Sequence, residues 1–208
     1  MLKTFTVLLA VLALSGCLRG LDRHGKQIKK MYVDQFTIET ILPKNAPSIS
    51  QHFRRLPNQM LSKESRREHL GIDFVADKGT PVLAPAPGRV VKSGLHALYG
   101  NTLELDHGVD TDGRRIHTIY KHLDSKIVTV GDVVARGQQL GGLGRTGVLS
   151  SGLLHLHFEV WQEDKRGNLR AVDPGLYWTG GRGRVECFDN EKTWASAPIR
   201  MTLPVICE

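Results

Sequence analysis

Short runs of Val, Ile, Leu and Thr alternate with turns of Gly, Pro or Asp between residue 69 and about residue 178. Apolar runs of this length, bounded by turn residues, predict β-strands. Asp112-Gly113 between two of the runs adds the signal of a tight hairpin. We therefore expect a mainly β domain. Its predicted strands cover residues 71–76, 81–83, 88–93, 101–107, 116–123, 138–142 and 154–162.

The first sixteen residues have the pattern of an export signal. Lys3 precedes an apolar run over residues 7–14, and small residues follow the run. The sequence LSGC at residues 14–17 resembles the lipobox of bacterial lipoproteins, which implies cleavage before Cys17 and attachment of lipid to it. The alternative is an ordinary signal peptide with an unrelated cysteine. The lipobox implies an exported, membrane-anchored protein that faces the periplasm, and Leu18 resembles the class that is sorted to the outer membrane.

The segment after Cys17 is polar, basic and irregular up to about residue 67. It predicts a tether and a lead-in segment, with one strand around residues 31–42. After residue 178 the chain begins rich in Gly and Arg and then shows no strong pattern. The expected parts are a lipoprotein signal peptide (1–16), a lipidated tether and lead-in segment (17–63), the β domain (64–178) and a C-terminal extension (179–208).

The composition is that of a folded domain. Hydrophobic residues make up 40% of the 208 residues, and no apolar run reaches the roughly 20 residues of a membrane-spanning helix. Lys and Arg (28) outnumber Asp and Glu (21), which gives a net charge of +7 and favours anionic partners. The dense basic stretches carry no interleaved aromatic residues, so we do not expect a nucleic-acid partner.

Cys187 and Cys207 are the cysteines that lipidation of Cys17 would leave unmodified. In an oxidising, exported location we expect a disulfide between them, closing a loop of about twenty residues. Two buried free thiols are the alternative. No Cys-x-x-Cys pair occurs, so a thiolate metal site is not expected.

Histidines recur at spacings that bring several polar side chains to one face of a strand. His69 and Asp73 are four residues apart, and His155 and His157 alternate with apolar residues. His122 lies near the end of another apolar run. Two histidines and an aspartate supply three ligands suited to zinc and leave a fourth position for water. Further histidines nearby can move protons and stabilise an oxyanion.

Other polar residues near these histidines receive a more modest interpretation. Glu159, two residues after His157, is either a partner of a metal-binding imidazole or a solvent-facing carboxylate on the strand. His96, His107 and His117 are predicted to be loop or hairpin groups rather than ligands.

The surroundings of these histidines resemble the lysostaphin-type (LytM-like) zinc metallopeptidases over about residues 69–173. The resemblance rests on residues 69–73 (HLGID), 79–82 (GTPV), 99–101 (YGN), 106–108 (DHG), 120–123 (YKHL), 128–132 (VTVGD), 137–141 (GQQLG) and 155–159 (HLHFE). Carried over position by position, it implies that His69, Asp73 and His157 bind one Zn²⁺ per chain. It also implies that His122 and His155 are the catalytic pair, which orients water and stabilises the tetrahedral intermediate.

The resemblance further implies a fold and a substrate. The expected fold is an antiparallel β-sheet with the metal in a groove walled by loops. The expected activity is that of a zinc metalloendopeptidase acting on peptidoglycan stem peptides or cross-links, and carboxypeptidase action stays open. In two places the chain departs from the family. The loop at residues 147–154 is about two residues longer and lacks a Pro, and the extension after residue 178 is outside the pattern.

Two competing functions have to be weighed against hydrolysis. A catalytically silent relative could bind the wall or activate another murein hydrolase, but such relatives typically lack some zinc ligands and all five positions are occupied here. Residues 128–138 also resemble biotinyl and lipoyl carrier domains. Asp77-Lys78 mimics the turn that holds the modified lysine of these domains. About fifty residues separate these two stretches, whereas a carrier keeps them in one compact unit. No regulatory protein partner can be identified from the sequence.

Overall fold

The computed structural model describes residues 37–54 and 68–208, which belong to one compact unit, Asp34–Glu208. The signal peptide, Cys17 and most of the tether expected from the sequence lie outside the described residues. In the described part of the chain, no helix has the length and apolar character needed to cross a membrane.

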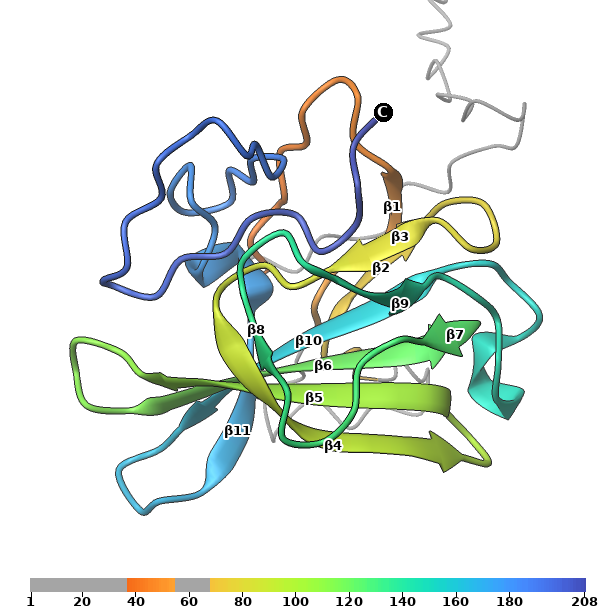
Figure 1. Cartoon of the computed structure of the whole chain (residues 1–208), viewed down its shortest axis with the longest axis horizontal. Helices are drawn as coiled ribbons and strands as arrows, with labels where there is room; N and C mark the ends of the chain where they lie inside the picture. Colours follow the sequence, from red (N-terminus) through yellow and green to blue (C-terminus); the bar gives the residue numbers. More distant parts are fainter. Residues whose placement is uncertain (1–36, 55–67) are drawn as a thin grey trace, which may run out of the picture. The chain divides into compact units, whose positions relative to one another are not determined.

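The centre of the fold is an eight-stranded sheet in which every strand pair is antiparallel (Figure 1). Its strands along the main path are, in spatial order, β1 (Ser48–Gln51), β2 (Ile72–Val75), β10 (Leu156–Glu163), β6 (Arg115–Leu123), β5 (Gly100–Val109), β4 (Gly88–His96) and β8 (Val133–Val134). β11 (Leu169–Val172) extends the sheet from the far end of β10. β10, which carries His157 and directly follows His155, therefore lies inside the sheet, between β2 and β6.

A second, three-stranded sheet and two short 3₁₀-helices complete the described elements. The sheet has the order β3 (Pro81–Leu83), β9 (Gln139–Gly142) and β7 (Ser125–Lys126). The 3₁₀-helices are η1 (Val148–Ser150) and η2 (Pro174–Leu176). The expectation of a mainly antiparallel β fold is confirmed. The pattern did not predict the short strands β1, β7, β8 and β11.

The period of two along β10 separates core from site. Leu156, Phe158 and Val160 are fully buried and pack in the core, whereas His157 and Glu159 point to the opposite side. Trp178 stacks on Phe158 with ring centroids 6.2 Å apart. Each such fully buried apolar side chain stabilises the fold by about 1.5–3 kcal/mol relative to exposure. The core thus fixes the strand whose other face carries the polar residues.

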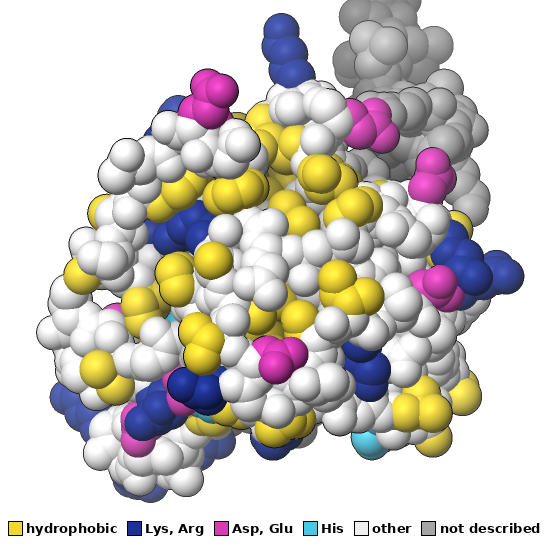
Figure 2. All heavy atoms as spheres, viewed as in Figure 1, with side chains coloured by type: hydrophobic (Ala, Val, Ile, Leu, Met, Phe, Trp, Pro, Cys, Tyr) yellow, Lys and Arg dark blue, Asp and Glu magenta, His cyan; other side chains and the backbone are white. Residues whose placement is uncertain are grey.

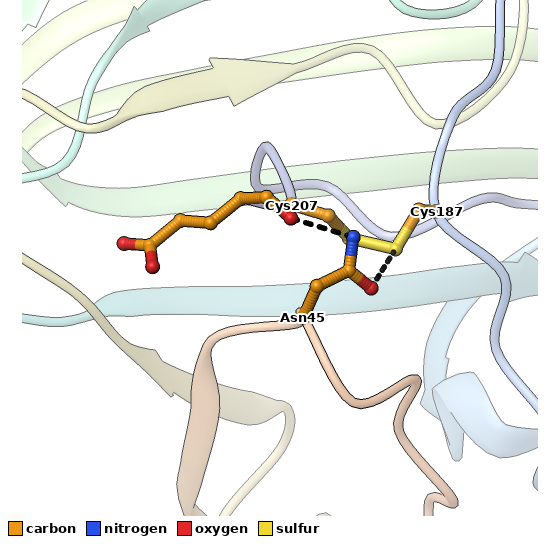
Figure 3. Close-up of a disulfide and its surroundings, with 4 residues drawn as sticks. Asn45, Cys187 and Cys207 are labelled. Carbon is orange, nitrogen blue, oxygen red and sulfur yellow. Dashed lines mark hydrogen bonds between the residues drawn. A yellow bond between two sulfur atoms is a disulfide. The ribbon is translucent and has the colours of Figure 1, made fainter.

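The C-terminal extension packs into the same core. Met201, Leu203 and Val205 are almost completely inaccessible. Cys187 and Cys207 form a disulfide with an S–S distance of 1.98 Å (Figure 3). The segment is therefore structurally part of the β domain, and the disulfide holds its last residues close to the body of the protein.

The described part of the lead-in segment also belongs to the fold. The strand expected around residues 31–42 is not formed over residues 37–42, where Ile41 makes a single bridge to Arg184. Pro43 follows at once and cannot donate to a ladder, which limits a strand there. β1 begins only at Ser48 and pairs with β2.

On the face shown in Figure 2, basic and acidic side chains are interspersed.

Candidate metal centre and active site

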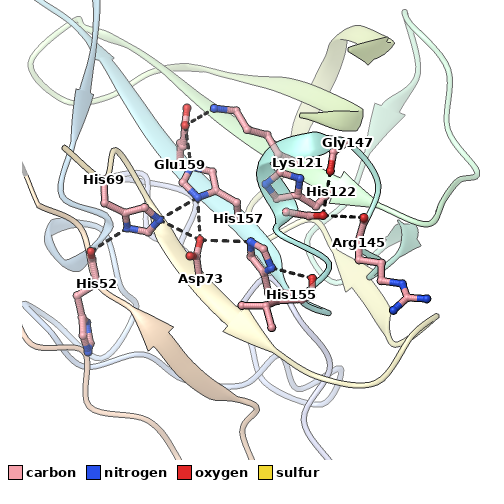
Figure 4. Close-up of polar contacts among 12 residues, drawn as sticks. His52, His69, Asp73, Lys121, His122, Arg145, Gly147, His155, His157 and Glu159 are labelled. Atoms are coloured by element: carbon pink, nitrogen blue, oxygen red, sulfur yellow. Dashed lines mark hydrogen bonds and ion pairs between the residues drawn. The ribbon is translucent and has the colours of Figure 1, made fainter. Parts of the chain in front are cut away.

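Three neighbouring strands bring the expected site residues together. β10 lies between β2 and β6, and its register places His157 opposite Asp73 on one side and Lys121 on the other. His155 directly precedes β10, and His122 is the penultimate residue of β6. Antiparallel pairing therefore converts residues far apart in sequence into a single row across the sheet (Figure 4).

Three ligand atoms converge at one end of this row. His69 Nε2 lies 3.0 Å from Asp73 Oδ1 and 3.1 Å from His157 Nδ1, and His157 Nδ1 lies 2.7 Å from the same carboxylate oxygen. Burial alone would raise the pKa of Asp73, but its contacts with the two imidazoles outweigh burial and hold the pKa well below its usual value. The aspartate is therefore ionised and available as a ligand.

The hydrogen bond made by the outer nitrogen of each imidazole determines which nitrogen carries the proton and which can bind a metal ion. His69 Nδ1 donates to the carbonyl oxygen of His52 at 2.8 Å, and His157 Nε2 donates to Glu159 Oε1 at 2.8 Å. With a proton fixed on each outer nitrogen, the inner nitrogens direct lone pairs towards Asp73. A cation must therefore lie among these three atoms, either a proton shared between an imidazole and Asp73 or a metal ion in its place.

This donor set fits a small divalent metal ion. Among the described residues, His69, Asp73 and His157 form the group whose ligand atoms all lie within 4.8 Å of one another. A tetrahedron with metal–ligand bonds of about 2.0–2.1 Å has edges of roughly 3.3 Å. The observed separations are shorter than this edge by at most about 0.6 Å, a difference that small side-chain rotations can supply.

Glu159 is buried at the side of the centre, which excludes the solvent-facing alternative considered from the sequence. It is 1% exposed, forms an ion pair with Lys121 and accepts a hydrogen bond from Trp161 Nε1 at 2.7 Å. Burial raises the pKa of Glu159, but the hydrogen bond from His157 and the charge of Lys121 more than compensate and hold the pKa at about 2. An ionised carboxylate thus supports the imidazole of His157.

A second pair of imidazoles lies at the other end of the row. The rings of His122 and His155 have centroids 4.8 Å apart, and His155 Nε2 is 4.0 Å from Asp73 Oδ1. Their Nδ1 atoms donate to the carbonyl oxygens of Thr146 at 2.9 Å and Leu153 at 3.0 Å. In the neutral form of each ring, Nε2 is then the nitrogen without a proton and can accept one.

The backbone and the titration of His122 are both unusual. Its φ of 67° lies in the left-handed region, which a non-glycine residue adopts at a cost and which is often found at functional sites. Burial lowers the pKa of His122 to about 4. The imidazole is consequently neutral at neutral pH, as an acceptor of protons must be.

The row of histidines forms the floor of an open groove with a volume of about 290 Å³. One wall comes from Ser50, Gln51 and Glu68, beside His69 and His52. The opposite wall comes from the loop at residues 149–153, beside His122 (Figure 4). Two backbone hydrogen bonds fix this loop, from Val148 N to Ala97 O and from Leu149 N to Leu98 O. The loop that is longer than the family pattern therefore lines the groove.

Sequence reasoning missed two sets of contacts at the centre. The His52 carbonyl lies in the lead-in segment and has no side-chain signature. Lys121 and Trp161 could have been found: Lys121 lies opposite His157 in the strand register, and Trp161 follows Glu159 by two residues on the same strand. The other histidines make different contacts. His107 contacts Pro87 O and Thr118, and His117 contacts Glu104. His96 contacts the ring of Tyr99.

The fold and the site together define a class: antiparallel β-sheet proteins with a candidate metal centre of histidine and aspartate side chains in a surface groove. Comparison with known proteins narrows this class. Residues 67–174, just over half of the chain, match Peptidase family M23, and the chain belongs to this family.

Relatives and solved structures agree with the family. The peptidoglycan DD-endopeptidase ShyC of Vibrio cholerae is 29% identical over 173 residues, which cover 82% of this chain and 36% of that protein. The uncharacterized lipoprotein YgeR of Escherichia coli is 32% identical over 118 residues, 56% of this chain and 42% of that protein. A crystal structure of a zinc-containing peptidase from Vibrio cholerae aligns with a TM-score of 0.50 and 29% identity over 73% of this chain and 42% of that one. The chain spans between about a fifth and about a third of the length of the first curated relatives that it matches.

Proposed function

We propose that the protein is a zinc-dependent metalloendopeptidase that hydrolyses peptide bonds in peptidoglycan stem peptides or cross-links, and so acts in cell-wall remodelling. The observation that carries the proposal is the convergence of His69 Nε2, Asp73 Oδ1 and His157 Nδ1 on the floor of an open groove, beside a second pair of imidazoles. Relatives named as peptidoglycan DD-endopeptidases support the substrate class. One relative is named as a DD-carboxypeptidase/endopeptidase, so exopeptidase action is tested together with endopeptidase action.

The metal and the protein contribute different chemistry. A zinc ion held by these three side chains would lower the pKa of a bound water to about 7 and polarise the scissile carbonyl. His155 and His122 have their Nδ1 protons tied to backbone carbonyls, so each Nε2 can accept a proton from the attacking water. The same imidazoles can then return the proton to the leaving nitrogen or donate a hydrogen bond to the developing oxyanion.

We further propose that the protein acts from a membrane. The lipobox-like sequence ending at Cys17 supports lipid attachment, and a relative is named as a lipoprotein. Attachment by lipid would place the groove in the periplasm near its substrate, with the outer membrane favoured by Leu18. Replacing Cys17 by Ser is expected to move the protein from the membrane fraction to the soluble fraction.

The decisive experiment combines metal analysis with digestion of purified peptidoglycan. We expect one zinc per chain by elemental analysis and new stem-peptide ends by mass spectrometry. His157→Ala is expected to lose both zinc and cleavage. His122→Ala should keep its zinc, and its turnover should be about 10²–10⁴-fold lower than that of the wild type. Loss of the metal in this variant would contradict the role assigned to His122.

The competing function gives a different result in the same experiment. A relative that binds the wall or activates another murein hydrolase would bind to peptidoglycan sacculi and release no fragments. Zinc bound at one per chain without any cleavage of intact sacculi or isolated cross-linked peptides would therefore favour this second function.

A further inference from the structure

A segment outside the family match reaches the metal centre from the edge of the sheet. We call residues 48–54 the arm; it consists of β1 and the three residues that follow it. β1 pairs with β2, and its register places Gln51 opposite Asp73. Arg54 and His69 then form an isolated bridge, with Arg54 N donating to His69 O at 2.7 Å and His69 N donating to Arg54 O at 2.8 Å. The backbones of two expected metal ligands are thus held by the arm.

The arm also contacts one ligand side chain directly. The carbonyl oxygen of His52 accepts the hydrogen bond from His69 Nδ1 at 2.8 Å (Figure 4). A carbonyl oxygen can only accept, so this contact keeps the proton on Nδ1 and the lone pair on Nε2. It also restricts rotation of the imidazole ring, which is how an outer partner orients a ligand.

Contacts with the rest of the domain hold the arm in place. Phe53 is 7% exposed, and its carbonyl accepts a hydrogen bond from Thr37 Oγ1 at 3.1 Å. Further back along the chain, Asn45 Nδ2 donates to Glu208 O at 2.7 Å, next to the disulfide (Figure 3). These contacts are those of a folded element, whereas a tether would have few.

We propose that the arm is a positioning element of the metal centre. The His52 carbonyl fixes the tautomer and ring orientation of His69, and the pairings of Gln51 and Arg54 fix the backbones of Asp73 and His69. The arm thereby sets the affinity of the centre for zinc. The proposal rests on the metal-binding part of the proposed function and is independent of the substrate.

The test uses a matched pair of substitutions in the full chain. Arg54→Pro removes the backbone N–H that donates to His69 O, because proline has no such hydrogen. Arg54→Ala removes the same side chain and keeps the N–H, so the ratio between the two variants isolates the backbone contact. Zinc affinity is measured by competition with a chromogenic chelator. We expect Arg54→Pro to bind zinc about 10–100-fold more weakly than Arg54→Ala, as loss of an outer partner typically does.

A second pair guards against a variant that fails to fold. Phe53→Ala removes the buried anchor of the arm, and Leu140→Ala removes a fully buried side chain of β9, in the other sheet. Both are expected to lower the melting temperature. Only Phe53→Ala is expected to weaken zinc binding, by about tenfold or more. Equal zinc affinities in Phe53→Ala and Leu140→Ala, or in Arg54→Pro and Arg54→Ala, would overturn the proposal.

The readout separates this inference from the proposed hydrolase. A wild-type protein that binds zinc but releases no peptidoglycan fragments would refute the hydrolase, and the predicted loss of zinc affinity in Arg54→Pro would still support the arm. A hydrolase whose zinc affinity is the same in both members of each pair would refute the arm alone. Absence of zinc binding in the wild type would overturn both.

Discussion

Replacing Glu159 by Gln tests whether the carboxylate behind His157 tunes the metal centre. The carboxylate accepts from three donors: His157 Nε2, Lys121 Nζ and Trp161 Nε1. A glutamine side chain has one carbonyl oxygen, and its amide group would face another donor. The substitution therefore keeps the shape of the side chain, removes its charge and leaves at least one of the three donors without a partner.

The magnitude follows from two separate effects. Loss of an outer carboxylate weakens metal binding about 10–100-fold, which corresponds to about 1.4–2.7 kcal/mol. Loss of one partner of a buried ion pair costs about 3–5 kcal/mol of folding stability. The side chain of Lys121 is 14% exposed and also lies 4.2 Å from the centre of the Tyr99 ring. We therefore expect a stability loss near the lower end of that range.

The assay measures zinc affinity by chelator competition and stability by urea denaturation of the metal-free protein. Glu163→Gln is the matched control, because Glu163 is on the same strand and accepts a hydrogen bond from Arg115 N at 3.3 Å, away from the metal ligands. The control is expected to bind zinc as the wild type does. A Glu159→Gln protein with wild-type zinc affinity would show that His157 is oriented without its carboxylate, and the reasoning would be wrong.

Three further outcomes are expected. Replacing Cys187 and Cys207 by Ser should lower the unfolding free energy by about 3 kcal/mol in urea, because the disulfide closes a loop with a sequence separation of 20; an unchanged midpoint would contradict this. Leu149→Ser should change the ratio of kcat/KM values among cross-linked peptides, whereas Val148→Ser, exposed but not lining the groove, should not; equal ratios in both would exclude the loop as a determinant. Burial lowers the pKa of His107 to about 4, so between about pH 6.5 and 4 the unfolded chain takes up a proton that the folded protein does not. The stability of the wild type should therefore fall as the pH falls through this window, and the fall should be less steep in His107→Gln. An identical pH dependence in the wild type and the variant would refute the assignment of this effect to His107.

The sequence predicted the parts of the fold that have a side-chain signature. Alternation of apolar and polar residues marked β10 and β6, because each has one face in the core. The two-residue strands β7 and β8 escaped prediction, since two residues are too few to show a period. β1 also escaped, because as an edge strand with little burial it carries no run of apolar residues.

The site was predictable to the extent that it consists of side chains. Spacing indicated that His155 and His157 share a face and that His69 and Asp73 share another, and the family resemblance assigned His69, Asp73 and His157 to one metal site. The position of His69 depends on more than its own side chain, since its outer nitrogen is bonded to a backbone carbonyl seventeen residues earlier. Every residue has such a carbonyl, so no sequence pattern can single out the one at His52.

Because of backbone contacts of this kind, the residues that form a site can extend beyond the segment that matches a sequence family. The family match begins at residue 67, yet the strand that pairs with Asp73 and the carbonyl that orients His69 precede it. A pairing strand contributes through N–H and C=O groups, which almost any residue supplies, so its sequence is free to vary while its geometry is kept. A shortened protein that begins at the family boundary would therefore retain all three proposed ligands and lose part of what would direct them at the metal.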